Sequence, residues 1–465
     1  MLFNSLHFLL FFVIVTGLYF IIEQKFRWLL LLLASCYFYM AYVPIYLVIL
    51  LFTIAIDYTA GILIESVIGY KRKVFLWVSI IANISVLATF KYYSFFHNEL
   101  SFLLEGFALV NPLPYLTFLL PIGLSFHTFQ AMSYTIEVFR GHQKAERHLG
   151  IYALYVMYYP QLVAGPIERP QNLLHQFQQK AEFSIVAFKA GLWLMAWGLF
   201  KKVVIADRLA IMVDYAYADY ETINALSFLV ASVFYSFQIY CDFSGYSDIA
   251  IGASAIMGIK LMTNFNLPYL SQSLTEFWRR WHISLSTWFR DYLFVPLGGS
   301  ATGNSFRTFI NLITVFLISG LWHGAAWTFI IWGLIHGIGV IMERIIGVSK
   351  RKHGYGIKKY FAILFTFSIV TLAWVFFRAP DFSIAIQMLS SLLHFSFNDK
   401  LELGSHFNEI LFAVFVIAIL LLKEKLILNF SPKNNWQYFG ALGIMVACCY
   451  LFGVFNQQQF IYFQF

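Results

Sequence analysis

The chain has 465 residues, of which 60% are hydrophobic and only 12% are charged, and its mean hydropathy is +0.72. About a quarter of the residues in soluble domains are charged, so this composition excludes a soluble globular protein. The net charge of +8 does not indicate nucleic-acid binding, because lysines and arginines lie in short clusters between apolar runs, as the positive-inside rule predicts. We therefore expect an all-α, polytopic membrane protein without a nucleic-acid partner.

Apolar runs close to the length of about 20 residues that crosses a bilayer recur along the chain. They predict spans near residues 3–22, 29–42, 45–66, 75–96, 115–138, 150–164, 187–206, 225–241, 245–262, 308–325, 327–344, 360–378, 407–423 and 437–455. Basic clusters at residues 25–27, 71–73 and 350–359 are typical of cytoplasmic loops, which places both termini outside. The first run lacks a basic n-region and a small-residue cleavage site, which favours a retained span over a signal peptide. We expect a single membrane domain over residues 1–465.

The stretch LTEFWRRWHISLSTWFRDYLF, residues 274–294, mixes charges with aromatic residues. At about 100° per residue its apolar side chains share one arc of a helix and its charged side chains share the opposite arc, which predicts an amphipathic helix at the bilayer interface or dipping partway into it. His282 lies near the boundary between the two faces, and Glu276 and Arg280 have the i,i+4 spacing of an ion pair. The apolar arc contains Phe277, Trp278, Trp281, Leu285, Trp288, Phe289 and Tyr292.

A second histidine lies in SGLWHGAAW, residues 319–327, inside a segment without Asp, Glu, Lys or Arg from Thr308 through Met342. Two interpretations of His323 are open. It is a packed side chain that bonds a backbone carbonyl or a serine such as Ser319, or it is functional, as intramembrane ionisable groups commonly are. A buried imidazole is neutral and can accept a proton from a hydroxyl group.

His336 follows His323 by thirteen residues. On one helix the two side chains would lie about 20 Å apart and point roughly 140° away from each other, so they could not share a metal ion or a proton. His336 is therefore expected to have a packing or supporting role, unless the glycines break the helix. His282 is the better partner for His323, and two such imidazoles could hold an acyl donor and an acceptor together. The sequence contains neither an HExxH nor a CxxC pattern, so we expect no metal.

Two further motifs have competing interpretations. Asp242 and Asp248 in YCDFSGYSDIAIG could serve acid–base work or ion transport, but a helix break at Asp242 with Asp248 heading the next helix is the favoured interpretation. Glu168 and Arg169 in VAGPIERPQ are interpreted as an exposed ion pair on a rigid turn. The four cysteines show no metal or disulfide spacing and are expected to pack in the core.

Together these motifs resemble the membrane-bound O-acyltransferase (MBOAT) family, in its bacterial branch of alginate and other polysaccharide O-acetyltransferases, peptidoglycan O-acetyltransferases and teichoic-acid D-alanyl transfer proteins. The resemblance implies a ring of transmembrane helices with re-entrant helices around a central tunnel. It covers a core at 120–345 and C-terminal spans at 346–465, whereas the spans in 1–115 agree only in character. The matching motifs are PIGLSFHTFQ (121–130), YYPQLVAGPIERP (158–170), CDFSGYSDIAIG (241–252), NFNLPYLSQSLTEFWRRWHISLSTWFRDYLFVPLGG (264–299), SGLWHGAAWTFIIWGLIHG (319–337) and FIYFQF (460–465).

The resemblance also implies roles for individual residues. His323 stands at the family's WHG histidine and His282 at its WHxS histidine, so His323 is expected to be the general base on the acceptor hydroxyl, or to help form an acyl intermediate, and His282 to position or polarise a thioester carbonyl. Candidates to line the tunnel are Trp281, Ser284, Arg290, Asp291, Trp322 and His336.

The resemblance implies transfer of an acetyl group toward an exopolysaccharide or cell-wall polymer. Acetyl-CoA is the expected donor, an acyl carrier protein is the alternative, and no bound cofactor is expected. The expected partners are membrane lipid and an extracytoplasmic acyltransferase, and the expected location is the bacterial cytoplasmic (inner) membrane. Two other functions are open: D-alanyl or other acyl transfer from a carrier protein to a wall polymer, and a transporter whose histidines relay protons.

Overall fold

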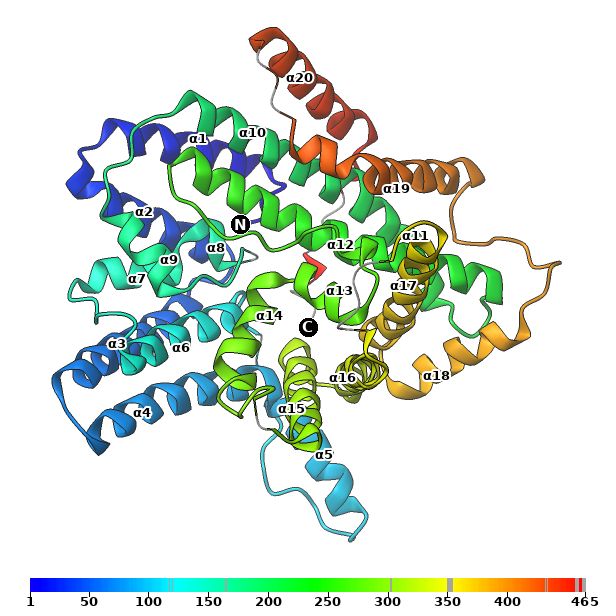
Figure 1. Ribbon diagram of the computed structural model, residues 1–465, viewed down its shortest axis with the longest axis horizontal. Helices are drawn as coiled ribbons and strands as arrows, with labels where there is room; N and C mark the ends of the chain where they lie inside the picture. The colour runs from blue at the N-terminus through cyan, green and yellow to red at the C-terminus, as the bar shows by residue number, and fades with distance from the viewer. Residues whose placement is uncertain are drawn as a thin grey trace. The chain divides into compact units, whose positions relative to one another are not determined.

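The computed structural model describes residues 1–116, 118, 120–163, 165–301, 303–348, 354–430, 432, 434–455, 460 and 461 (Figure 1). All of the regular secondary structure in this part of the chain is helical, which confirms the predicted all-α class. The chain divides into two compact units. The first unit contains Met1–Gly191 and Ala250–Met262, and the second contains Leu192–Ile249 and Thr263–Phe465. Two helices, α10 (Ile185–Phe200) and α12 (Ala225–Ile256), cross the boundaries between these segments.

Within the described residues, six helices are long and apolar enough to cross a membrane. They are Tyr46–Ser66, Tyr70–Glu105, Ala225–Ile256, Ser305–His323, Trp327–Ile346 and Ile357–Arg378. The chain is therefore a multi-pass membrane protein, as its composition predicts. The central tunnel and the re-entrant helices remain predictions.

One part of the predicted span pattern is wrong. Separate spans were expected at 225–241 and 245–262, with a break and cap at Asp242, whereas α12 is one continuous helix of 32 residues. Asp242 and Asp248 lie in its interior, where an aspartate cannot cap a helix N-terminus. Their carboxylates instead form ion pairs with the ammonium groups of Lys201 and Lys202.

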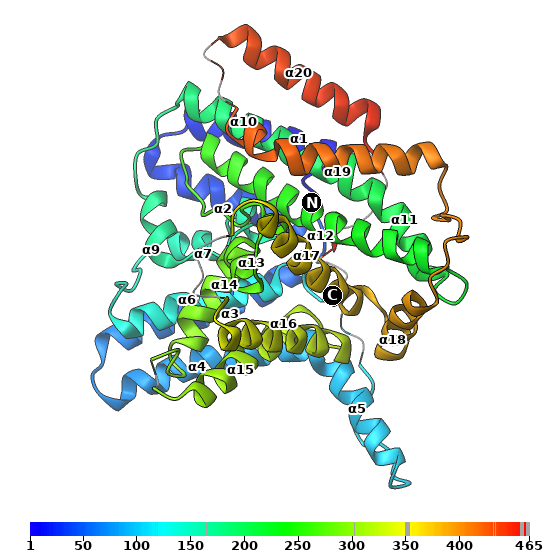
Figure 2. The same cartoon turned by 45° about the vertical axis from the view of Figure 1, so that its right-hand side comes forward.

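In the described residues of the first unit, eleven short and long helical elements precede α10. In chain order they are α1 (Leu6–Ile21), α2 (Gln24–Met40), α3 (Tyr46–Ser66), α4 (Tyr70–Leu87), η1 (Ala88–Tyr92), α5 (Tyr93–Glu105), α6 (Leu124–Arg140), α7 (Leu149–Met157), α8 (Tyr159–Leu162), α9 (Pro170–Leu173) and η2 (Leu174–Phe177). Helices α3, α4 and α6 pack side by side (Figures 1 and 2). The buried Asp57 carboxylate of α3 accepts hydrogen bonds from Ser79 Oγ at 2.5 Å and Asn83 Nδ2 at 2.9 Å, both on α4.

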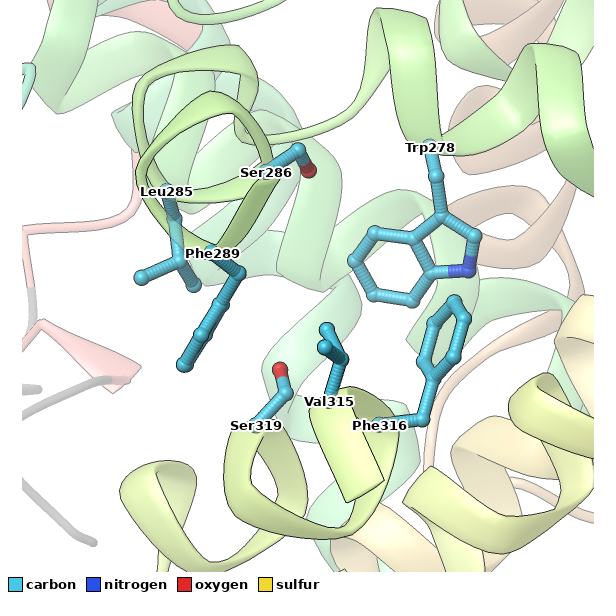
Figure 3. A pocket seen from close by; sticks show the side chains of 7 residues that line it. All are labelled: Trp278, Leu285, Ser286, Phe289, Val315, Phe316 and Ser319. Carbon is cyan, nitrogen blue, oxygen red and sulfur yellow. The ribbon is translucent and has the colours of Figure 1, made fainter. Parts of the chain in front are cut away.

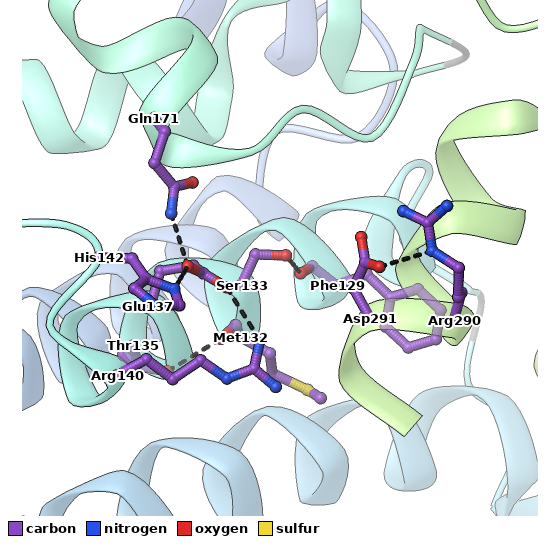
Figure 4. A network of polar contacts seen from close by, with 10 residues as sticks. All are labelled: Phe129, Met132, Ser133, Thr135, Glu137, Arg140, His142, Gln171, Arg290 and Asp291. Atoms are coloured by element: carbon purple, nitrogen blue, oxygen red, sulfur yellow. Dashed lines mark hydrogen bonds and ion pairs between the residues drawn. The ribbon is translucent and has the colours of Figure 1, made fainter. Parts of the chain in front are cut away.

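Two glutamates organise the loops of this unit. Glu137, near the end of α6, accepts hydrogen bonds from Arg140, His142 and Gln171 at 2.6–3.2 Å (Figure 4). Glu168 is fully buried, so the predicted exposure of its carboxylate is wrong. The Glu168 carboxylate accepts a hydrogen bond from the Met262 backbone N–H, which fastens the 165–169 loop to the segment after α12. Burial raises the pKa of Glu168 to about 7.

The second unit begins with the last turns of α10 and continues through the π-helix η3 (Lys201–Ala206), α11 (Asp207–Ala218) and most of α12. The later elements are η4 (Pro268–Leu270), α13 (Leu274–Arg280), α14 (Ile283–Phe289), η5 (Arg290–Phe294), α15 (Ser305–His323), α16 (Trp327–Ile346), α17 (Ile357–Arg378), α18 (Phe382–Ser391), η7 (Leu392–His394), α19 (Phe407–Leu428) and α20 (Asn435–Phe452). Helix α13 packs against α16 and α17, and α16 packs against α15 (Figure 2).

Helices α15 and α16 form a hairpin whose backbones approach closely. A Cβ atom on Gly320 would lie 2.2 Å from the Phe329 carbonyl oxygen, and one on Gly333 would lie 2.3 Å from the Phe316 carbonyl oxygen. Neither position can hold a side chain without displacing the partner helix. Small residues permit such close packing between membrane helices, so the glycines of SGLWHG and WGLIHG fix the distance between α15 and α16.

Candidate functional site

The helix predicted over residues 274–294 is interrupted at His282. Helix α13 ends at Arg280, α14 begins at Ile283, and His282 between them has a left-handed backbone with φ of +42°. A non-glycine residue in this region is strained and requires support from its surroundings. The prediction of one continuous amphipathic helix is therefore wrong, although most of its faces are as expected. Phe277, Trp281 and Leu285 are buried, and Arg280 pairs with Glu276 at 2.5 Å.

The support for His282 comes from Asn264. The Asn264 carbonyl accepts a hydrogen bond from the Ile283 backbone N–H at 2.9 Å. The Asn264 side-chain Oδ1 lies 3.3 Å from the Ser284 backbone N–H, 2.8 Å from Ser284 Oγ and 3.1 Å from His282 Nδ1. Asn264, His282 and Ser284 are all buried. The predicted candidate Ser284 therefore lies beside His282 and shares its partner.

The N-terminus of α13 is fixed by carboxylates. Glu343 of α16 accepts hydrogen bonds from the backbone N–H groups of Leu274 and Thr275, and Glu276 accepts one from Gln272 at 2.8 Å. Carboxylates at a helix N-terminus satisfy its free N–H groups and complement the helix dipole. This links the helix that leads into His282 to the helix that follows His323.

His323 is the last residue of α15, and Gly324 caps the helix with an extended backbone. The chain reverses through Gly324–Ala326 and enters α16 at Trp327. The helix therefore breaks between His323 and His336. The separation of about 20 Å that one continuous helix would impose on the two side chains no longer applies. The hairpin brings both rings against Trp332: the ring centroids of His323 and His336 each lie 5.0 Å from that of Trp332.

Aromatic rings connect the two predicted catalytic histidines. The ring centroid of Trp322 lies 4.9 Å from that of His323 and 6.2 Å from that of His282, and both contacts are T-shaped. His323 also packs edge-on against Phe377 of α17, and His282 packs edge-on against Phe243 of α12 at 4.6 Å. The structure therefore brings His282, Trp322 and His323 into one buried aromatic cluster within the second unit.

The other predicted candidates divide into two groups. Trp281 is buried against Trp374, and His336 Nδ1 accepts a hydrogen bond from Trp278 Nε1 at 3.3 Å, so both belong to the buried surroundings of the histidines. Arg290 and Asp291 pair with each other at 2.7 Å, with side chains 61% and 36% exposed (Figure 4). Arg290 and Asp291 are not part of the buried cluster.

A small pocket lies between α13, α14 and α15, and its lining includes Trp278, which donates a hydrogen bond to His336 (Figure 3). Its volume is about 90 Å³, which is about three times the volume of a water molecule in liquid water. Trp278 and Phe316 close one side and Leu285 and Phe289 the other, with Val315 between them (Figure 3). The hydroxyl groups of Ser286 and Ser319 add two polar groups. Ser319 precedes His323 by one helical turn, and Ser286 follows His282 by four residues.

The electrostatics of His282 follow from its burial. Its ring packs on Phe243, Phe265 and Trp322, and it lies outside the helices that are long and apolar enough to cross a membrane. Desolvation lowers the pKa of His282 to about 3. The imidazole is consequently neutral at physiological pH and has one nitrogen able to accept a proton.

The second unit also contains a buried cluster of charges that the sequence motifs do not predict. Lys202 Nζ lies 2.7 Å from both Asp207 and Asp242, and Lys201 Nζ lies 2.7 Å from Asp248 and 3.6 Å from Glu424. The two lysines are on the π-helix η3, and π-helical turns are frequent at functional sites. The signal was present in the sequence, since two consecutive lysines interrupt the apolar run WLMAWGLFKKVV.

Residues of α12 connect this charge cluster to the surroundings of His282. Tyr240 donates a hydrogen bond to Glu424 at 2.9 Å and packs against Trp281, and Asp242 is followed by Phe243, which contacts His282. Asp242 also accepts a hydrogen bond from the Ile461 backbone N–H at 2.7 Å. Paired and hydrogen-bonded charges of this kind hold helices in one arrangement, because removing one partner leaves an uncompensated buried charge.

No group of three or more His, Cys, Asp or Glu side chains in the described part of the chain could hold a metal ion. The expected absence of a metal therefore stays a prediction. The chemistry available at the site is that of two imidazoles, two serine hydroxyls and an apolar pocket, which suits proton transfer next to a small acyl group.

Comparison with known proteins agrees with the motifs. The family model of the membrane-bound O-acyltransferases (MBOAT) matches residues 140–379. The chain is 39% identical over 398 residues to a probable alginate O-acetylase, AlgI, of Pseudomonas aeruginosa, covering 85% of this chain and 75% of that protein. It is 35% identical over 488 residues to a peptidoglycan O-acetyltransferase of Helicobacter pylori, covering 94% and 91%. It is 30% identical over 285 residues to a teichoic acid D-alanyltransferase of Streptococcus thermophilus, covering 55% and 68%.

Proposed function

The chain belongs to the membrane-bound O-acyltransferase family and is thus a membrane-embedded acyltransferase, and we propose that it transfers an acetyl group from a cytoplasmic thioester toward an extracytoplasmic acceptor for O-acetylation of an exopolysaccharide or cell-wall polymer. The observation that carries the proposal is the convergence of His282 and His323 on the ring of Trp322. The relatives with high coverage of this chain are O-acetyltransferases, which favours acetyl over D-alanyl as the acyl group.

The reaction needs one proton to move from the acceptor to the leaving group. The acceptor hydroxyl oxygen bonds to the acyl carbon, the carbon–sulfur bond breaks, and the hydroxyl proton passes through an imidazole to the departing thiolate. Positioned acid–base groups contribute about 10²–10⁴-fold to such reactions, and holding both reactants in one geometry contributes further. In this proposal the imidazoles of His282 and His323 carry out the proton transfer and hold the thioester carbonyl.

The pocket beside the histidines is proposed to receive the acyl end of the donor. An acetyl group has three non-hydrogen atoms, which matches a volume of about 90 Å³. A pocket of this size suits a short acyl group. The apolar side chains of Leu285, Phe289 and Val315 would surround the methyl group, and the hydroxyls of Ser286 and Ser319 would lie near the carbonyl.

The surroundings of the enzyme are also proposals. The donor is acetyl-CoA or an acetylated carrier protein on the cytoplasmic side, the acceptor is a partner acyltransferase outside the membrane, and the membrane is the bacterial inner membrane. These proposals rest on the membrane-spanning helices and on the relatives in the bacterial polysaccharide and peptidoglycan branch.

Acetyl transfer by the purified chain in proteoliposomes tests this function. With labelled acetyl-CoA and a membrane extract as acceptor, we expect labelled acetyl esters from the wild type and a loss of at least about 10²-fold in His323→Ala and His282→Ala. The matched control is His394→Ala, because His394 is an exposed histidine of the same unit. Equal transfer by all four proteins would contradict the proposal. Labelling from D-alanyl carrier protein alone would favour D-alanyl transfer, and solute flux without a donor would favour a transporter.

A further inference from the structure

The side chain of Asn264 defines which ring nitrogen of His282 carries the proton. The Oδ1 atom of Asn264 faces the backbone N–H of Ser284, and a backbone N–H only donates. The amide is therefore oriented with its oxygen toward His282 and Ser284. In this orientation its Nδ2 group points the opposite way and donates to Ser247 Oγ of α12 at 3.2 Å.

An amide oxygen accepts hydrogen bonds and cannot donate them. His282 Nδ1 lies 3.1 Å from Asn264 Oδ1, so Nδ1 must carry the hydrogen that joins them. Ser284 Oγ, 3.4 Å from Nδ1, donates its own hydrogen to Oδ1 at 2.8 Å and so does not supply the proton to the ring. In a neutral imidazole with its hydrogen on Nδ1, the lone pair available for chemistry is on Nε2.

We propose that Asn264 is a positioning residue that holds His282 in the Nδ1–H tautomer, so that His282 acts as a proton acceptor through Nε2. The inference rests on the proposed function. It changes the role expected for His282, because a neutral ring without a hydrogen on Nε2 cannot donate a hydrogen bond to a thioester carbonyl. The acceptor hydroxyl proton passes to Nε2, the hydroxyl oxygen bonds to the acyl carbon, and Nε2–H returns the proton to the thiolate as the carbon–sulfur bond breaks.

The backbone geometry supports the same conclusion. His282 has a left-handed backbone, and Asn264 bonds the two residues that follow it, through its own carbonyl to Ile283 and through Oδ1 to Ser284. One residue thus fixes both the direction in which the ring projects and the nitrogen that is protonated. Partners that orient an imidazole in this manner set its tautomer in catalytic and metal sites alike.

The test measures the tautomer directly and separately from activity. The full chain with ¹⁵N-labelled histidine is placed in nanodiscs, and the His282 signals are identified as those missing in His282→Gln. We expect the wild type to show a protonated Nδ1 and an unprotonated Nε2. In Asn264→Leu we expect both tautomers, with kcat for acetyl transfer reduced by about 10²-fold and KM for acetyl-CoA unchanged. Asn311→Leu is the matched control, because Asn311 is a buried asparagine that bonds Leu297 and Gly299 instead.

Asn264→Asp is a second variant, which keeps the test valid if Asn264→Leu does not fold. Its carboxylate has nearly the same shape as the amide and still accepts a hydrogen bond from Nδ1. We expect this variant to keep the Nδ1–H tautomer and to raise the NMR-measured pKa of His282, since a carboxylate favours the charged imidazole. The neighbouring carboxylate on α12, Asp242, is already paired with Lys202 and is the same in both proteins. A wild type protonated on Nε2, or no change of tautomer in Asn264→Leu and no pKa change in Asn264→Asp, overturns the positioning role. Full transfer by His282→Gln overturns the catalytic assignment instead.

Discussion

Trp322 lies between the two histidines, and its ring contacts both His282 and His323. We expect Trp322→Ala to insert normally and to reduce kcat by about 10²-fold, since a displacement of about 1 Å in a catalytic group has effects of that size. Trp436→Ala is the control, because Trp436 is 86% exposed. Acetyl transfer in proteoliposomes measures the effect, and equal rates for the two variants would show that Trp322 does not hold the histidines in place.

The depressed pKa of His282 predicts how stability depends on pH. The unfolded imidazole takes up a proton below its ordinary pKa of 6.5, whereas the folded one does so only near 3. Between these two pH values the unfolded state therefore binds more protons than the folded state. The free energy of unfolding decreases as the pH falls from about 6.5 toward 3. Glu168, with its pKa raised to about 7, acts in the opposite sense and loses stability as the pH rises through 4.5 to 7.

The thermal midpoint of the chain in nanodiscs, measured from pH 4 to 8 in wild type and His282→Gln, isolates the contribution of His282. We expect the difference between the two proteins to decrease below about pH 6.5, because the variant has no imidazole to protonate. The Glu168 contribution is common to both proteins and cancels. A difference that stays constant across this range would mean that His282 titrates normally in the folded protein.

Single residues were partly predictable from the sequence. The WHG and WHIS motifs predict both histidines, because the motifs are local in the chain. Asn264 was not predicted as a partner of His282, since it lies eighteen residues away and only the folded chain brings them together. Arg290 and Asp291 are tunnel candidates from the resemblance, yet their side chains are exposed and pair with each other.

The α15–α16 hairpin is the element that places His323. Gly320 touches the backbone of Phe329, and a Cβ atom there would lie 2.2 Å from a carbonyl oxygen. We expect Gly320→Ala to destabilise the protein by about 1–3 kcal/mol, as overpacking does, and to reduce acetyl transfer. Gly440→Ala on α20 is the control, because nothing lies within 4 Å of its added Cβ and alanine favours a helix. Equal thermal midpoints for the two variants would contradict the close approach of α15 and α16.

The pocket between α13, α14 and α15 predicts selectivity for the length of the acyl chain. Phe289→Ala enlarges the pocket. We expect its ratio of kcat/KM for propionyl-CoA to kcat/KM for acetyl-CoA to be about 10-fold higher than that of the wild type, because one methylene group is worth about 10–200-fold in an apolar site. Val315→Phe fills the pocket and should raise KM for acetyl-CoA. Competition between the two donors measures the ratio, and an unchanged ratio in both variants would place the acyl group elsewhere.

At the scale of elements, periodicity predicted the helices better than their ends. The apolar and polar faces of 274–294 are largely as expected, but the break at His282 depends on hydrogen bonds from Asn264 that no local pattern contains. The aspartates of CDFSGYSD suggested a break in α12, and the break is absent because Lys201 and Lys202 neutralise them inside the fold. An aspartate beside an apolar run fits both a helix cap and a buried ion pair. The local sequence cannot separate the two when the lysine that pairs with the aspartate lies far away in the chain.

For the whole molecule, composition alone established the class. A chain with 12% charged residues and repeated apolar runs has to be a membrane protein, and six described helices are able to span a bilayer. The number of spans was not predictable, because several apolar runs form helices too short to cross, among them α1 and α7. The division into two compact units was also beyond the sequence, since it arises from the joining of Ala250–Met262 to the first unit.

In this proposal, His323 and His282 carry out acetyl transfer in cells. The most direct measurement is the O-acetyl ester content of the extracellular and wall polysaccharides of the host, with the chain deleted and then restored as wild type, His323→Ala, His282→Ala or His394→Ala, each at equal membrane abundance. We expect the esters to return with the wild type and the exposed-histidine control and to stay absent with the other two variants. Normal ester content with His323→Ala and His282→Ala would contradict the account.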